Sequence, residues 1–289
     1  MSFAVRRLSP ACGSEIIGLD LSEPLSDSQF QNIVQAWDDS QGVLVFRDQK
    51  ITPEQHIAFS KRFGELVTGK PGTMMYDYYL PGYPEIFRVS NKSLNGLPLG
   101  REDAGAYWHS DGSWMEKPPA ASLLHALEIP EIGGDTMFAN MYAAYDKLSP
   151  PMQRMLDGLH VVHDRTAAAS TSYGKEFSRG GSDATSSAVH PLVTTHPRTG
   201  KKSLFVNPGF SATIEELTAA ESKTILAHLF QHAVSAETTY RHSWRLHDIV
   251  MWDNRCVLHY AVSDYKNIGV RYMQRTTVRG EKPVGVAHA

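Results

Sequence analysis

The 289-residue sequence contains only two cysteines, Cys12 and Cys256, and they lie far apart in the chain. A disulfide framework or a cysteine-based zinc site usually needs more cysteines, so we expect neither. Long apolar runs are also missing. None approaches the roughly 18–20 residues that span a bilayer, and no apolar segment follows the N-terminal arginines as it would in a secretory signal. We therefore expect a cytoplasmic protein with no membrane partner.

Neither sign of charge is in marked excess, since 28 Lys and Arg residues face 31 Asp and Glu residues, for a net charge of −3. Nucleic-acid-binding domains usually carry a basic surface, so we expect no nucleic acid partner. A hydrophobic content of 42% and a charged content of 20% are ordinary for a globular protein. The length suits a single domain over residues 1–289 with a substantial core.

The common local motifs of enzyme sites are absent as well. The sequence has no G-x-G-x-x-G, Walker A, H-E-x-x-H, G-x-S-x-G or C-x-x-C pattern. The dinucleotide-binding, P-loop, zinc-protease, serine-hydrolase and thioredoxin classes therefore lose their main support. Any chemistry must come from residues that are distant in the sequence.

Capping boxes predict the starts of three helices. In this motif a serine or threonine is followed three residues later by glutamate or glutamine, and the two side chains satisfy free backbone N–H groups at the helix start. The pairs are Ser26 with Gln29, Thr52 with Gln55, and Thr218 with Glu221. A fourth segment, "LSPPMQRMLDG", has a Ser-Pro start of the kind seen at helix N-termini.

Short runs with the composition of strands occur between these helices and are separated by Gly and Pro. The runs are "GVLVF" (42–46), "ASLLHALE" (121–128), "GDTMFANM" (134–141), "KSLFVN" (202–207), "DIVMWDN" (248–254), "CVLHYAV" (256–262) and "RYMQRTTV" (271–278). Many short strands with a few helices predict a mainly β fold, a sandwich or barrel with flanking helices. No regular βαβ alternation favours a Rossmann sheet.

Two further segments have the composition of long loops. Residues 66–106 are rich in Gly, Pro, Asn and Tyr, and residues 165–188 are small and polar. Loops of this length inside a compact domain are usually functional or disordered. We expect the first to be a variable substrate loop, and for the second a lid and a disordered segment are both open.

The stretch "WHSDGSW" (108–114) places His109 and Asp111 two residues apart. On a strand both side chains would face the same way, so that an imidazole and a carboxylate could approach one cation. The dipeptide alone is weak evidence, and a polar strand end with an Asp–His hydrogen bond is the more common interpretation.

The C-terminal region changes this balance. His259 stands in the apolar run "CVLHYAV", where an unpaired imidazole would be costly to bury. Farther on, Arg271 and Arg275 share one face of the strand expected at 271–278. Adjacent arginines repel each other unless anions neutralise them, and a guanidinium suits bidentate binding of a carboxylate. The alternative is a pair of exposed or ion-paired surface arginines.

Two histidines, an aspartate and a downstream arginine match the facial triad of non-haem iron(II) oxygenases, in which three coordination positions stay open. The sequence also resembles the iron(II)/2-oxoglutarate-dependent dioxygenases of the taurine dioxygenase and 2,4-dichlorophenoxyacetate dioxygenase family over nearly its full length. The resemblance rests on "VLVFRDQKITPEQHIAFSKRFGEL", "WHSD" followed by "PPA", "GGDTMFANMYAAYDKLS", "THPRTGKKSLFVNPGF" and "IVMWDNRCVLHYAVSDY…RYMQRTTV".

The resemblance implies a double-stranded β-helix, a cupin-like jelly-roll barrel. It implies Fe(II) held by His109, Asp111 and His259, and 2-oxoglutarate held by Thr136 and Arg271. With dioxygen, such an enzyme converts 2-oxoglutarate to succinate and CO2 while it hydroxylates a substrate C–H, which can lead to C–S, C–O or C–N cleavage. The Asp111 carboxylate also favours oxygenation over halogenation, because related halogenases lack it.

On the substrate side the resemblance implies that Arg275 meets an anionic group and that Phe210 lines the pocket. The chain departs from the taurine enzyme after "RFGEL", where that enzyme has a sulfonate-binding histidine and this chain reads Val-Thr-Gly-Lys. Lys70 is a candidate for the missing charge, or an ordinary exposed lysine. The stretch "MMYDYYLPGY" offers candidates for the wall of a larger pocket, namely Met74, Met75, Tyr76, Tyr78 and Tyr79, which could equally pack the loop or form a subunit contact. Asn91 stands where the family's substrate loop begins.

We therefore expect an enzyme that acts on a small anionic substrate, such as a sulfonate, an alkyl sulfate, an aryloxyalkanoate or an amino-acid-derived metabolite. Two alternatives remain open. A zinc-dependent hydrolase would use the same His/Asp/His set, but it gives no role to the arginines or to Thr136. A non-catalytic binding protein of the same fold is the other. The resemblance further implies a homo-oligomer, a dimer or a tetramer.

Overall fold

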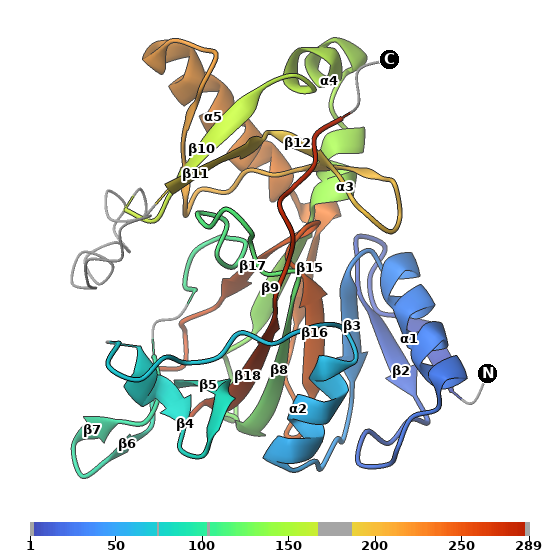
Figure 1. Cartoon of the computed structure of the whole chain (residues 1–289), viewed down its shortest axis with the longest axis vertical. Helices are drawn as coiled ribbons and strands as arrows, with labels where there is room; N and C mark the ends of the chain where they lie inside the picture. Colours follow the sequence, from blue (N-terminus) through green and yellow to red (C-terminus); the bar gives the residue numbers. More distant parts are fainter. Residues whose placement is uncertain (1–2, 74, 103–104, 167–186, 287–289) are drawn as a thin grey trace.

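Strands dominate the computed structural model, which describes residues 3–73, 75–102, 105–166 and 187–286 (Figure 1). The helices that it describes are α1 (Asp27–Asp39), α2 (Pro53–Lys61), α3 (Met141–Asp146), α4 (Pro150–Leu156) and α5 (Ala219–Ala233), with the 3-10 helices η1 (Tyr76–Tyr78) and η4 (Ala236–Thr238). The predicted mainly β architecture with flanking helices is confirmed. Within these ranges, no helix combines the length and the apolar character needed to cross a membrane.

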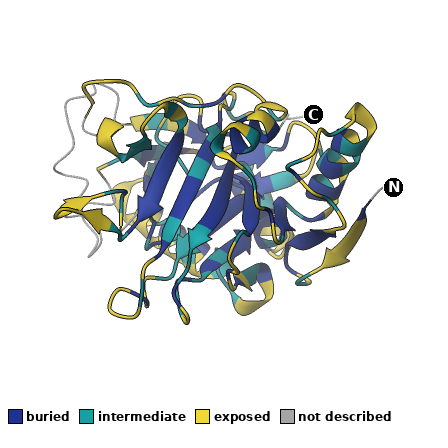
Figure 2. Ribbon diagram, turned by 90° about the horizontal axis from the view of Figure 1, so that it is seen from below, coloured by how far each residue is buried: buried dark blue, intermediate teal, exposed yellow. Residues whose placement is uncertain are grey.

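The largest sheet has eight strands, and those at its centre are the most deeply buried (Figure 2). In spatial order they are β1 (Ala4–Arg7), β2 (Ser14–Ile17), β3 (Val43–Phe46), β16 (Ile249–Asp253), β8 (Ala121–Glu128), β18 (Tyr272–Val278), β5 (Tyr83–Ser90) and β4 (Tyr79–Leu80). Neighbours are antiparallel except β2 and β3. Strands from both ends of the sequence are thus hydrogen-bonded into one layer.

Smaller sheets complete the strand framework. One consists of β15 (Thr239–His242), β9 (Thr136–Asn140) and β17 (Val257–Ala261) in that order. Another consists of β11 (Ser187–Pro191), β10 (His160–Asp164) and β14 (Ser211–Ile214). Two pairs remain, β12 (Val193–Thr195) with β13 (Lys202–Leu204), and β6 (Ser93–Leu94) with β7 (Leu97–Pro98). The first of these sheets matters most, because β9 and β17 carry candidate site residues.

Strand β16 illustrates how alternation of side chains builds two apolar layers. Its residues Ile249 and Met251 belong to a cluster that also holds side chains of α1 and α2, so these helices cover one face of the large sheet. Val250 and Trp252 point to the other face and share a cluster with Phe138 of β9. A strand buried on both faces needs such a continuous apolar run, as "IVMW" provides.

The β9–β17 sheet lies against the large sheet, and a tight turn joins them. Strand β16 ends at Asp253, and the amide of Cys256 donates to the Asp253 carbonyl at 3.3 Å before β17 begins. The chain therefore passes from one layer to the other within a few residues. His259 lies in the middle of β17, so this turn fixes where its side chain enters the space between the layers.

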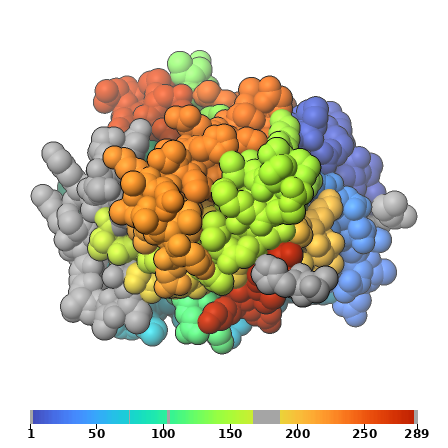
Figure 3. Space-filling view, turned by 90° about the horizontal axis from the view of Figure 1, so that it is seen from above, coloured from blue at the N-terminus to red at the C-terminus, as the bar shows by residue number. Residues whose placement is uncertain are grey.

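Helices α3, α4 and α5 and the small strands β10–β14 form one end of the molecule (Figure 1). Their apolar side chains make a separate buried cluster that includes Leu156, Leu192 and Leu229. Figure 3 shows α4 and α5 side by side on the surface of this end. The three predicted capping boxes are present at α1, α2 and α5, with both hydrogen bonds made in each.

Two expectations about the chain need correction. The segment 66–106 is not simply a loop, because β5 is an eight-residue strand inside it with residues 86–90 buried. Pro84 and the Gly- and Tyr-rich flanks hid this strand, which is paired to β18 and shielded from solvent. The strand expected at 202–207 ends at Leu204. Most of the other expected loop, residues 167–186, lies outside the described residues.

Buried histidines give the fold a dependence on pH. His56 is fully buried, with Nε2 at 3.3 Å from the Thr276 hydroxyl and its ring 5.8 Å from that of His125. Burial lowers the pKa of His56 to about 3 and that of His125 to about 4, and each of these rings has a second histidine nearby that lowers its pKa further. Both imidazoles are therefore neutral in the folded protein at ordinary pH.

We predict that the free energy of unfolding falls as the pH drops below about 6.5, the pKa of histidine in an unfolded chain. Below this pH the histidines of the unfolded chain bind protons, whereas the buried histidines of the folded chain stay neutral. Each such histidine then lowers the free energy of unfolding by about 1.4 kcal/mol per pH unit. Denaturant titrations of the metal-free protein between pH 7 and pH 5 should show this slope. It should become shallower in His56→Asn and stay unchanged in His228→Asn, which replaces an exposed histidine. An unchanged slope in His56→Asn contradicts the assignment.

Candidate metal centre and cavity

A pair of backbone hydrogen bonds brings His109 next to His259. The His109 amide donates to the His259 carbonyl at 3.1 Å, and the His259 amide donates back at 2.9 Å. The two imidazole rings lie with their centroids 4.1 Å apart. This single bridge is the only strand-like feature of the 108–114 stretch, whose Asp111 lies in a turn. The assumption of a strand at 108–114 is therefore wrong. The turn, not a strand, places the Asp111 carboxylate close to the two imidazoles.

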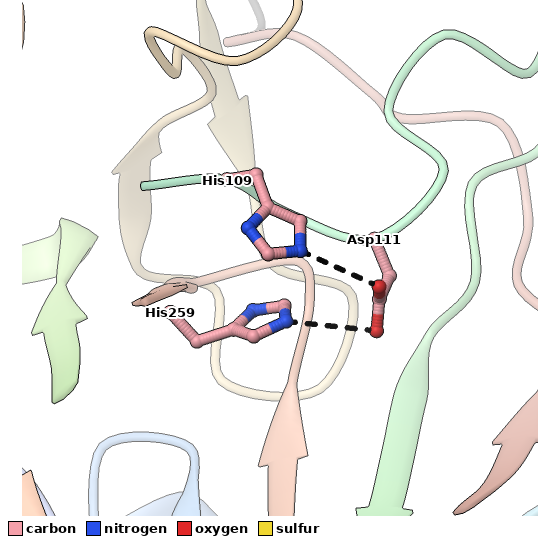
Figure 4. A group of neighbouring side chains, drawn as sticks. All are labelled: His109, Asp111 and His259. Atoms are coloured by element: carbon pink, nitrogen blue, oxygen red, sulfur yellow. Dashed lines mark ion pairs between the residues drawn. The ribbon is translucent and has the colours of Figure 1, made fainter. Parts of the chain in front are cut away.

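Figure 4 shows both imidazoles directing Nε2 at the Asp111 carboxylate. Nε2 of His109 lies 3.8 Å from Oδ1, and Nε2 of His259 lies 3.9 Å from Oδ2. One ligand atom from each of the three residues lies within 4.8 Å of the other two, so the group could hold a metal ion. Nδ1 of His109 is hydrogen-bonded to the Tyr107 carbonyl at 2.8 Å, which leaves Nε2 as the lone-pair donor.

The protonation states of these groups also suit a cation. Burial lowers the pKa of His109 and, together with the neighbouring His109, lowers that of His259 well below its usual range. Burial alone would raise the pKa of the Asp111 carboxyl. Arg275 and then the two histidines outweigh it, so this pKa lies well below its ordinary value. Neutral imidazoles and an ionised carboxylate are the forms that bind a metal.

A buried hydrogen-bond network holds Asp111 from behind. The Ser122 hydroxyl donates to Oδ2 at 2.7 Å, and the Asn254 side chain donates to Ser122 at 3.3 Å. The Asn254 side-chain oxygen in turn accepts the indole N–H of Trp252 at 3.0 Å. Arg275 contributes from the cavity side, with Nη1 at 3.0 Å from Oδ1. The carboxylate is thus oriented before any ion arrives.

The three groups line a cavity of about 410 Å³. Thr136, Arg271, Arg275 and Phe210 line the same cavity, so the structure brings these seven predicted residues together. Aromatic rings form much of the wall, with Trp114 at 4.3 Å from Phe210 between ring centroids. The volume falls in the range of small-molecule sites.

Lys70, Tyr76 and Asn91 do not line this cavity in the described part of the chain. Lys70 and Tyr76 are exposed. Asn91 accepts the backbone N–H of Arg271 at 2.8 Å and donates to the Gly269 carbonyl at 3.0 Å, so it holds the segment that presents Arg271.

Of the candidates in the tyrosine-rich stretch, Met75 and Tyr79 line the cavity and Tyr76 does not. Sequence reasoning missed Tyr107, Arg101 and Arg165, which line it as well. Tyr107 lies two residues before His109, so on an extended segment it faces the same way, which is a usable signal. Arg101 and Arg165 stand in irregular segments where no periodicity predicts the direction of a side chain.

A second group, His196, Asp253 and Cys256, also lies within metal-binding distance. Its carboxylate already has cationic partners, since Arg255 binds Asp253 at 2.8 and 2.6 Å and Arg198 lies 3.6 Å away. Burial raises the pKa of the Cys256 thiol well above its ordinary value, which disfavours the thiolate that a metal needs. We interpret this group as a buried ion-pair network that closes the turn between β16 and β17.

We predict that Ser122→Ala weakens metal binding about tenfold, because loss of an outer-shell partner of a ligand typically costs 10–100-fold in affinity. Calorimetric titration of the apoprotein with Mn(II) measures this directly. Ser203→Ala is the matched control, since Ser203 is equally buried and its hydroxyl has no partner among the described residues. Equal Mn(II) affinities of Ser122→Ala and the parent protein would show that the network does not orient Asp111.

Comparisons with known proteins agree with this geometry. The model of the family described as "Taurine catabolism dioxygenase TauD, TfdA family" matches residues 4–277. The chain is 35% identical to an alpha-ketoglutarate-dependent 2,4-dichlorophenoxyacetate dioxygenase of Cupriavidus pinatubonensis, over 90% of this chain and 92% of that protein. It is 33% identical to an alpha-ketoglutarate-dependent sulfonate dioxygenase of Saccharomyces cerevisiae, over 97% of this chain and 68% of that protein.

Solved structures give the same result. The crystal structure of AAD-2 in complex with Mn(II) and N-oxalylglycine superposes with a TM-score of 0.84 at 33% identity, covering 98% of this chain and all (100%) of that one. A taurine dioxygenase from Burkholderia xenovorans gives a TM-score of 0.82 at 33% identity, covering 100% and 96%. The predicted double-stranded β-helix is thereby confirmed. The chain belongs to the TauD/TfdA family and is an iron(II)- and 2-oxoglutarate-dependent dioxygenase.

Proposed function

We propose that this dioxygenase oxidises a small anionic organic molecule that carries an aromatic or similarly bulky apolar group. His109, Asp111 and His259 hold the iron, Thr136 and Arg271 hold 2-oxoglutarate, and Arg275 meets the anionic group of the substrate. The observation that carries the proposal is the convergence of these six side chains on one aromatic-walled cavity. A zinc hydrolase would leave Thr136 and Arg271 without a role, and membership of the family does not support that alternative.

Three separate backbone segments supply the residues that would hold the iron. Asp111 comes from a turn, His109 from the bridge next to it and His259 from β17, and all three line the cavity. When bound, iron(II) and 2-oxoglutarate supply the oxidative decarboxylation to succinate and CO2 that drives oxidation of the substrate by dioxygen. The chain contributes orientation of the reactants around two buried histidines, His109 and His259.

Arg271 supports the assignment of the cosubstrate site. Its side chain is 2% exposed, and in the described part of the chain no carboxylate lies within ion-pair distance. Its Nε donates to the Gly134 carbonyl at 3.2 Å, and the Tyr265 side chain is a further neighbour that favours the charged guanidinium. Burial lowers the pKa of Arg271, a sign that the buried charge lacks full compensation. The distal carboxylate of 2-oxoglutarate would supply that compensation.

Arg275 supports an anionic substrate. Its guanidinium lies 5.4 Å from the centroid of the Phe87 ring, and its Nε has no hydrogen-bond partner in the described structure. Because Nη1 already contacts Asp111, an anion bound to the rest of this guanidinium lies beside the iron ligands. The carbon next to that anionic group is then the one presented for oxidation. In an aryloxyalkanoate this carbon also bears the ether oxygen, so its hydroxylation leads to C–O cleavage.

The relatives agree with this choice of substrate class, since they are described as acting on 2,4-dichlorophenoxyacetate, on sulfonates and on (S)-phenoxypropionate. The rings of Tyr79, Phe87, Trp114 and Phe210 in the cavity wall favour a substrate with an aromatic ring over a short aliphatic one. The homo-oligomer and the cytoplasmic location stay predictions, and light scattering of the purified protein tests the first.

We predict that anaerobic addition of Fe(II) and 2-oxoglutarate to the apoprotein produces a visible charge-transfer absorption band. Admission of air with 2,4-dichlorophenoxyacetate or an alkanesulfonate should then release succinate in stoichiometric amounts with substrate loss. His109→Ala should lose both the band and turnover, because two remaining ligands do not hold the ion. A full band and full turnover in His109→Ala would overturn the ligand assignment, and a band without turnover on any anionic compound would overturn the substrate class.

We predict that Arg275→Gln raises the KM of the anionic substrate about 10–100-fold, the range expected for loss of a charge-assisted hydrogen bond of about 1.5–3 kcal/mol. The methyl ester of the same substrate, which has no anionic charge, should lose far less. Arg279→Gln is the matched control, since Arg279 lies just beyond β18 and pairs with Glu65 on the surface. Equal losses for the acid and its ester would remove Arg275 from substrate binding.

A further inference from the structure

Trp244 makes a direct contact with a proposed cosubstrate residue. Its indole Nε1 lies 3.0 Å from the Thr136 hydroxyl, and both side chains are buried. An indole N–H can only donate a hydrogen bond, so the Thr136 oxygen must be the acceptor. The hydrogen of the Thr136 hydroxyl is then left for a different partner. Because Thr136 lines the cavity, a ligand bound there can accept this hydrogen.

The same indole also touches the second proposed cosubstrate residue. The guanidinium carbon of Arg271 lies 5.8 Å from the Trp244 ring centroid and 5.7 Å from that of Tyr265. Cation–π contacts of this kind restrict the position of a guanidinium without using its N–H donors. Trp244 therefore acts on both groups at once: it restricts the Arg271 guanidinium and directs the Thr136 hydroxyl.

The fold fixes the position of this indole. Trp244 follows β15, whose His242 is the register partner of Thr136 in β9. The rings of His242 and Trp244 meet edge to face at 4.8 Å between centroids. His242 is in turn 3.3 Å from the buried Asp248 carboxylate. The donor of the indole is thus held against Thr136 by backbone pairing and by packing, so it is ready before a ligand enters.

We propose that Trp244 is a positioning residue that makes the Thr136 hydroxyl a hydrogen-bond donor and, with it, prepares Arg271 for the distal carboxylate of 2-oxoglutarate. The proposal rests on the function proposed above, in which Thr136 and Arg271 hold that carboxylate. Its consequence is selectivity among 2-oxo acids. The Trp244 indole favours the binding of 2-oxo acids with a second carboxylate over those without one. Binding of the 2-oxo acid group itself does not depend on Trp244.

Trp244→Phe tests this, because phenylalanine keeps an aromatic ring in the core and removes the N–H. The Mn(II)-loaded protein is titrated calorimetrically with 2-oxoglutarate and with pyruvate, which keeps the 2-oxo acid group and lacks the distal carboxylate. The affinity for 2-oxoglutarate should fall about tenfold, within the range for a hydrogen bond to a charged group. The affinity for pyruvate should stay unchanged, which a general loosening of the fold would not produce.

Trp37→Phe is the matched control. Trp37 is 1% exposed, and its indole N–H donates to the Gly42 carbonyl at 3.0 Å, so the substitution removes a buried hydrogen bond of the same length outside the cavity. It should change the thermal stability and leave both affinities as they are. If Trp37→Phe lowers the affinity for 2-oxoglutarate as much as Trp244→Phe does, the loss reflects reduced stability and the proposal is wrong.

Thr136→Ala and the double variant separate this proposal from the assignment beneath it. If Thr136→Ala leaves 2-oxoglutarate affinity intact, the proposed cosubstrate site itself fails. If Thr136→Ala lowers the affinity for 2-oxoglutarate and Trp244→Phe does not, only the role proposed for Trp244 is wrong. The proposal requires that the double variant lose less than the product of the two single losses, because both changes remove the same interaction. Independent, multiplicative losses would overturn it.

Discussion

The reciprocal backbone hydrogen bonds between His109 and His259 are the interaction on which the site depends. They join a segment with no regular secondary structure to the middle of β17, 150 positions later in the chain. Strand β17 is itself fixed by β9, whose first residue is Thr136. His259 and Thr136 therefore share one small sheet, and a shift in its register would displace a proposed metal ligand and a proposed cosubstrate residue together.

Burial of charge at this site works against stability and is compensated locally. Asp111 and Arg275 neutralise each other within the described structure, whereas Arg271 and the two neutral imidazoles keep capacity for further partners. A metal and an anionic cosubstrate would bind these groups in the folded state alone, so their binding free energy adds to folding stability. The buried groups that lower the folding stability thus link ligand binding to the stability of the barrel.

Much of this architecture could be predicted because it rests on short-range chemistry. The capping boxes at Ser26, Thr52 and Thr218 each depend on only four consecutive residues. The continuous apolar run "IVMW" indicates a strand that is buried on both faces. Strand β5 escaped prediction because Pro84 and flanking glycines mask a pairing with β18, which depends on contacts far away in the sequence. The His109–Asp111 pair was identified on the assumption of a strand, although a turn produces the arrangement.

The same reasoning explains why two residues of the proposed site are easier to predict than the rest of the cavity wall. His259 and Thr136 lie on strands, where a period of two fixes the direction of each side chain. Tyr79 and Tyr76 are three positions apart, and the backbone changes between them from the 3-10 turn η1 to strand β4. Tyr79 consequently packs against Phe87, whereas Tyr76 is exposed to solvent. Composition alone does not distinguish the two tyrosines, and the backbone between them decides which one lines the cavity.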